Sequence, residues 1–113
     1  MEVIAESLKE IIKNYLKTLH EHQRVIAETR LECFRLNFKN IGVQTIEALA
    51  RLSFIRLEDE TCKYLLAHSG GMDDRNHLVE EIPLINDFYL FLEDFGLQAV
   101  PQFSLSKLME YLE

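Results

Sequence analysis

Residues 3–38 read VIAESLKEIIKNYLKTLHEHQRVIAETRLECFRLNF, a stretch that contains neither glycine nor proline. Its apolar residues recur every three or four positions, with charged residues between them, which is typical of an amphipathic helix. We therefore expect a single helix from residue 3 to residue 38. It should end before Asn40-Ile41-Gly42, because Asn and Gly adopt the left-handed conformation that closes helices.

This expected helix is longer than one copy of the chain can cover. About 36 residues at ~1.5 Å each make a rod of ~54 Å, whereas a compact domain of this size is roughly 35 Å across. The helix must either break or have its apolar side covered by a second copy. The sequence favours a homodimer, because two-fold dimers are the commonest closed assembly. The expected dimer interface consists of Ile4, Leu8, Ile11, Tyr15, His22 and Val25.

Two histidines lie in the middle of this stretch. His20 and His22 diverge by about 200° on a helix, so they cannot share one metal ion. His22 is expected within the apolar stripe, either as a hydrogen-bonded core or interface histidine or as a pH-sensitive dimer contact.

The rest of the chain predicts shorter helices. Their expected ranges are 43–57, a run from Glu58 ended by Ser69-Gly70-Gly71, a run through Leu78 to Ile82, 84–95 closed by Gly96, and 105–112 capped by Ser104. Pro83 should begin or kink the 84–95 segment, and residues 52–57 are also compatible with a short strand. The expected fold class is all-α, with residues 1–113 as a single domain. We expect a bundle of four to five helices, built on the long N-terminal helix and completed by dimerisation.

Composition indicates a soluble globular domain, since 48% of the residues are hydrophobic and 27% are charged. No apolar run is long enough for a membrane span, and the start of the chain lacks a signal-peptide pattern. Cys33 and Cys62 both lie in apolar stretches, which predicts reduced, buried thiols. We therefore expect a cytoplasmic protein without a membrane association.

The excess negative charge lies in one part of the chain. Residues 1–40 sum to +1, residues 41–69 to −1 and residues 70–113 to −7, which together give the net charge of −7. Direct nucleic-acid binding is not expected, because phosphate contacts need clustered Lys and Arg. A basic protein partner would be attracted to this part of the chain. The simpler interpretation is an acidic face that keeps the protein soluble.

One segment, 86–95, reads NDFYLFLEDF and combines aromatic with acidic residues. The aromatic side chains point in different directions around a helix, so one short face cannot bury them all. An exposed acidic and aromatic surface suits docking of a partner. The expected partner-binding residues are Asp87, Tyr89, Phe91, Glu93 and Asp94. The alternative is a central helix that the first helix covers.

Signals of chemistry are weak. A polar cluster around Gly70-Gly71, formed by His68, Asp73, Asp74, Arg75 and His77, could hold a divalent cation or transfer protons, but helix caps and a loop explain it as well. Neither cysteine has a sequence context that supplies a general base. There is no glycine-rich phosphate loop. We expect no enzymatic activity, no cofactor and no metal site.

Three functional classes follow. The preferred one is a small acidic helical module for protein–protein interaction, expected to be homodimeric. The alternative is an acidic blocking protein, such as an immunity protein, antitoxin, secretion chaperone or anti-activator, that masks a basic partner. The least favoured is a metal-binding protein or enzyme that uses the 68–77 loop.

Overall fold

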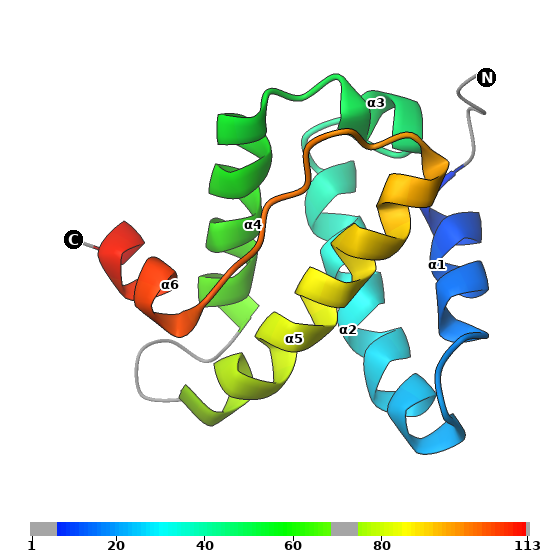
Figure 1. The fold of residues 1–113 in the computed structure, drawn as a ribbon, viewed down its shortest axis with the longest axis horizontal. Coiled ribbons are helices and arrows are strands. Elements are labelled where there is room, and N and C mark those ends of the chain that lie inside the picture. Colours follow the sequence, from blue (N-terminus) through cyan, green and yellow to red (C-terminus); the bar gives the residue numbers. More distant parts are fainter. Residues whose placement is uncertain (1–6, 69–74, 113) are drawn as a thin grey trace.

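A computed structural model describes residues 7–68 and 75–112, with side chains described for 7–67 and 78–111. These residues form an all-α fold, which confirms the predicted class (Figure 1). In chain order the elements are α1 (Leu8–Leu16), α2 (Glu21–Lys39), α3 (Ile46–Ala50), α4 (Phe54–His68), α5 (Arg75–Leu92), the 3₁₀ helix η1 (Glu93–Phe95) and α6 (Leu105–Leu112). Within this part of the chain there are thus six α-helices and not four to five. None of them is long and apolar enough to cross a membrane.

The predicted single helix over 3–38 is wrong, because the chain turns between Leu16 and Glu21. Thr18 donates two hydrogen bonds to the carbonyl of Tyr15, one from its hydroxyl (2.7 Å) and one from its backbone N–H (2.9 Å). The guanidinium of Arg24 then donates to the carbonyls of Leu16 (3.0 Å) and Leu19 (3.1 Å). The last carbonyls of α1 are therefore satisfied without a continuing helix.

The turn makes α1 and α2 an antiparallel hairpin (Figure 1). The start of α1 lies beside the segment that follows α2, where the N–H of Leu8 donates to the carbonyl of Gln44 at 2.9 Å. The described residues measure 43 × 34 × 22 Å, so the hairpin fits within one copy. The geometric reason for a dimer is removed, and dimerisation itself stays a prediction. The predicted end of the helical stretch is confirmed, since α2 ends at Lys39 and Gly42 has φ +82°.

The predicted helix over 43–57 is also divided. Thr45 caps α3 by accepting from the N–H of Ala48 at 3.0 Å, and α3 ends at Ala50. Ser53 then accepts from the N–H of Arg56 at 3.2 Å and begins α4. This helix starts at Phe54, earlier than the run expected from Glu58, and it includes residues 54–57 of the segment that was also compatible with a strand.

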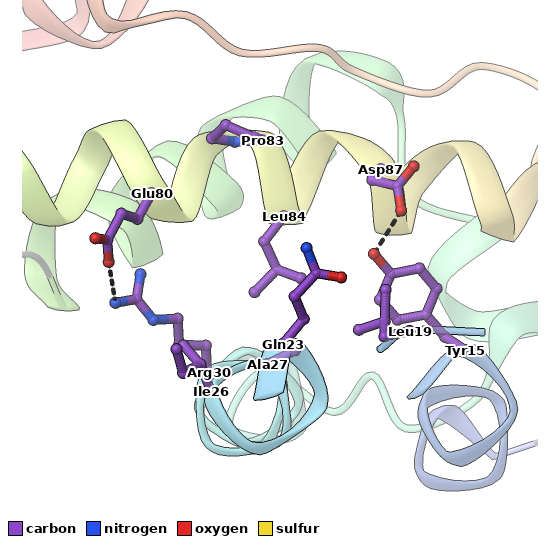
Figure 2. A pocket seen from close by; sticks show the side chains of 10 residues that line it. All are labelled: Tyr15, Leu19, Gln23, Ile26, Ala27, Arg30, Glu80, Pro83, Leu84 and Asp87. Atoms are coloured by element: carbon purple, nitrogen blue, oxygen red, sulfur yellow. Dashed lines mark hydrogen bonds and ion pairs between the residues drawn. The ribbon is translucent and has the colours of Figure 1, made fainter. Parts of the chain in front are cut away.

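The helices expected on either side of Pro83 form one helix, α5. Pro83 lies inside it with its ring on the exposed side (Figure 2). The predicted closure at Gly96 is confirmed, because this glycine has φ +105° after η1. Ser104 caps α6 as predicted, accepting from the N–H of Lys107 at 3.2 Å.

The core lies where α2, α4 and α5 meet. Phe34 is at its centre, and its ring contacts Phe38, Tyr64, Phe88 and Tyr89 at centroid distances of 4.9 to 5.8 Å. Buried aromatic pairs in this range add stability beyond their buried area. These contacts fix α5 across α2 and leave its opposite side exposed.

A connector runs from η1 back along α5 to α6 (Figure 1). The side-chain amide of Asn86 donates to the carbonyl of Phe103 at 2.9 Å and accepts from its N–H at 2.8 Å. On α6, Lys107 forms an ion pair with Glu58 on α4 at 2.5 Å. The connector therefore covers one edge of α5, and the opposite edge faces α2.

Candidate functional site

The outward face of α5 combines apolar and acidic side chains. Val79, Pro83 and Leu90 lie at helical spacing on this face, and all three are exposed. The carboxylates of Glu80 and Asp87 stand beside them, also exposed. The opposite face of α5 is buried in the core, whereas the apolar side chains of this face remain accessible.

The acidic character continues beyond the end of α5. Glu93 and Asp94 are both exposed on η1, and the sequence from residue 78 to residue 100 contains no Lys, Arg or His. We call the exposed set formed by Val79, Glu80, Pro83, Asp87, Leu90, Glu93 and Asp94 the α5 strip. Its carboxylates are therefore not neutralised from their own segment of the chain.

A groove lies between the α5 strip, α2 and the end of α1 (Figure 2), with a volume of about 480 Å³. Its walls are largely apolar. Leu19, Ile26 and Ala27 line it from the α1–α2 hairpin, and Pro83 and Leu84 line it from α5. Ile26 is 54% exposed, so it adds accessible apolar surface to this wall of the groove.

Each end of the groove is bounded by a carboxylate of α5 (Figure 2). At one end Arg30 Nη2 lies 3.2 Å from Glu80 Oε2, and the Glu80 side chain remains 70% exposed. At the other end the hydroxyl of Tyr15 donates to Asp87 Oδ2 at 2.6 Å. Burial, followed by this hydrogen bond and the charge of Asp87, raises the pKa of Tyr15. The phenol therefore stays a neutral donor to the carboxylate over the whole physiological range.

The structure places the predicted partner-binding residues on two sides of α5. Asp87, Glu93 and Asp94 are exposed, and Phe91 is half-buried. Tyr89 is fully buried in the core, where its hydroxyl lies 2.6 Å from that of Thr61. The helical turn explains this difference, because positions 87 and 89 lie about 200° apart.

The residues expected at a dimer interface are divided in the same way. Leu8, Ile11 and Tyr15 are buried against the chain's own core, whereas His22 and Val25 are exposed on α2. The expectation that His22 lies within an apolar stripe is wrong, because the break at residues 17–20 changes the phase of the helix that follows. Ile4 lies outside the described residues.

The positions considered for chemistry are the polar residues of the 68–77 cluster and the two cysteines. Asp73 and Asp74 lie outside the described residues, and the side chains of His68, Arg75 and His77 are not described. Among the described side chains, no group of three or more His, Cys, Asp or Glu could hold a metal ion. Cys33 and Cys62 are free thiols, and burial raises the pKa of Cys62 to about 11.

A second cavity of about 410 Å³ lies near the start of α4, lined by Leu52, Phe54, Leu57 and the chain after η1. Phe54 and the neighbouring Ile55 are exposed. The lining contains no ionisable side chain, so this cavity offers no charge by which a partner could be selected.

Sequence reasoning identified the acids after residue 86 but missed the groove itself. Ile26, Arg30, Glu80 and Leu84 were not singled out, because the groove depends on the turn between α1 and α2. One signal was present in the sequence. Glu80 and Asp87 are seven residues apart, and a helical segment without any basic residue joins them.

No family model matches this chain, and neither a curated protein nor a solved structure shows significant similarity to it.

Proposed function

We propose that this protein is a small helical interaction module that binds a basic segment of another protein on the α5 strip. The observation that carries the proposal is the set of four exposed carboxylates, Glu80, Asp87, Glu93 and Asp94, in a segment without a basic residue. From residue 80 to residue 94 they extend over ~21 Å of helix axis. Rows of like charge of this kind steer oppositely charged partners and select among them.

Exposed apolar side chains supply apolar surface that a bound segment can bury, which charged groups alone do not. Val79, Pro83 and Leu90 lie among the carboxylates, so a bound segment would bury apolar surface and also place its cations. An acidic face that served solubility alone would not need them. This combination of anchors and charges is typical of specific protein interfaces.

The narrower version of the proposal is a blocking protein. A basic segment that lies along the α5 strip is itself covered, so its own contacts to phosphates or acidic surfaces are lost. The acidic charge of residues 70–113 supports this version.

The test uses a synthetic peptide rich in Lys and Leu, with fluorescence anisotropy to measure its binding. We expect the double variant Glu93→Lys/Asp94→Lys to bind the peptide about 10-fold more weakly than the unaltered protein, because two rim charges are reversed. The affinity should also fall as salt is raised. A peptide with Glu in place of Lys should not bind.

The matched control is Glu28→Lys/Glu110→Lys, which makes the same change in net charge at two exposed positions on α2 and α6. We expect this variant to retain most of the affinity. Equal losses in both double variants would mean that only net charge matters, and this result would overturn the α5 strip as the binding surface.

A further inference from the structure

We infer that the groove beside the α5 strip takes an amphipathic helix of the partner, with two basic side chains seven residues apart and large apolar side chains between them. This inference rests on the proposed function, since it names the form and spacing of the basic segment. It follows from the contents of the groove, from the distance between its two carboxylates and from the all-helical fold.

The spacing comes from α5 itself. Glu80 and Asp87 are seven residues apart on the groove side of one helix, which is about two turns or ~10.5 Å. A second helix lying along the groove repeats its side chains with the same period, so residues i and i+7 would meet the two carboxylates. Its residues i+3 and i+4 would then face the space between them.

That space suits apolar side chains. Leu19, Ile26 and Leu84 face it (Figure 2), and the groove volume is about 480 Å³. The charged groups stand at the two ends. Between them lie apolar side chains and the uncharged amide of Gln23. The two carboxylates match the two cations of the inferred helix, and the apolar lining between them matches its apolar pair.

A helix fits better than an extended segment. The described residues contain no strand that could extend into a sheet with a bound peptide. An extended peptide would leave its backbone groups without protein partners, whereas a helix satisfies its own. A second copy of this chain is disfavoured as occupant, because each copy has a net charge of −7.

The two ends of the groove should contribute unequally. Glu80 already has a cation beside it, since Arg30 lies at 3.2 Å. Asp87 accepts from the neutral hydroxyl of Tyr15, so its charge is not offset there. A carboxylate offers about four acceptor sites, which leaves both groups able to accept from a partner. The cation at Asp87 should therefore bind more strongly.

The test compares two helical peptides of identical composition, one with Lys at i and i+7 and Leu at i+3 and i+4, the other with the second Lys moved to i+5. We expect the i, i+7 peptide to bind the unaltered protein about 10-fold more tightly. Asp87→Asn should remove most of this preference, and Glu80→Gln should remove less. Ile26→Asp should weaken binding of the i, i+7 peptide about 10-fold or more.

The matched control for Ile26→Asp is Val25→Asp, which introduces the same charge at the neighbouring position. Val25 is 65% exposed and does not line the groove, so its replacement should leave the peptide affinity within about two-fold. Circular dichroism of all variants shows whether each one is folded.

Three results would overturn the inference. Equal binding of both peptides, reduced together by Glu93→Lys/Asp94→Lys, would leave the proposed function intact and exclude the helix register. Absence of binding by either peptide would exclude the proposed function as well. A lower molar mass in light scattering for Ile26→Asp than for Val25→Asp would identify a second copy of the chain as the occupant of the groove.

Discussion

At the scale of single residues, Asn86 has an unusual role for an amide on a helix. Its side chain forms both hydrogen bonds with the backbone of the buried Phe103, as one strand residue does with another. In this way a single residue fixes the connector against α5. Without the amide, the N–H and carbonyl of Phe103 would lose their partners, which is costly for buried groups.

We expect Asn86→Ala to lower the free energy of unfolding by roughly 1–3 kcal/mol, because two backbone hydrogen bonds are lost near the core. Urea denaturation measures this change. The control is Gln102→Ala, since the exposed Gln102 makes only hydrogen bonds to backbone carbonyls, at 3.0 and 3.3 Å. If Asn86→Ala were no more destabilising than Gln102→Ala, the connector would not depend on the amide.

At the scale of elements, the turn between α1 and α2 has the largest effect on the fold. The periodicity of residues 3–38 is compatible with one helix, yet side chains of the stretch itself satisfy the carbonyls at the end of α1. Thr18 donates to the carbonyl of Tyr15 and Arg24 to that of Leu16, and Arg24 also donates to the carbonyl of Leu19 in the turn. The turn brings Leu19 and Ile26 to the same groove.

We expect Arg24→Ala to destabilise the protein by roughly 1 kcal/mol, because two charge-assisted hydrogen bonds to carbonyls are lost. Arg24→Lys should restore only part of this, since an ammonium lacks the planar fork of the guanidinium. Thermal unfolding followed by circular dichroism measures both. Arg51→Ala is the control, because Arg51 pairs with Glu47 on the surface. Equal effects of Arg24→Ala and Arg51→Ala would exclude a role for Arg24 in the turn.

At the scale of the whole molecule, the core contains several phenols that must stay protonated. Burial raises the pKa of Tyr89 and of Tyr64, and for Tyr64 the charge of Glu81 adds to the effect. In the unfolded chain a tyrosine titrates near ~10. As the pH rises above that value, the unfolded state loses protons first. The free energy of unfolding should therefore fall with increasing pH in this range.

We expect the free energy of unfolding to be nearly constant from about pH 7 to 8, to begin to fall near about pH 9, where the Cys62 thiol titrates in the unfolded chain, and to fall steeply above about pH 10. Tyr89→Phe should make this fall shallower, because one of the groups responsible is absent. Urea unfolding at a series of pH values gives the slope. An unchanged slope in Tyr89→Phe would show that the alkaline loss of stability has another origin.

The sequence by itself determined the helical class, the acidic character of residues 70–113 and several helix ends. These are local properties. Gly96 and Ser104 act through the conformation or the hydrogen bonds of their own neighbourhood, so their effects can be recognised without knowing the rest of the chain. Asp87, Glu93 and Asp94 were predicted from the combination of acidic and aromatic residues in segment 86–95, and their exposure is what is usual for charged side chains.

Only the tertiary structure decided where the long apolar stretch breaks, which face of α5 is buried and which residues meet in the groove. Tyr89 lies on the buried face. Periodicity is equally good for one helix and for two, because the choice depends on hydrogen bonds such as those of Arg24 and on packing against elements distant in sequence. Ile26, Glu80 and Leu84 come from two helices that no local pattern joins. They form one surface only because the core around Phe34 fixes α5 across α2.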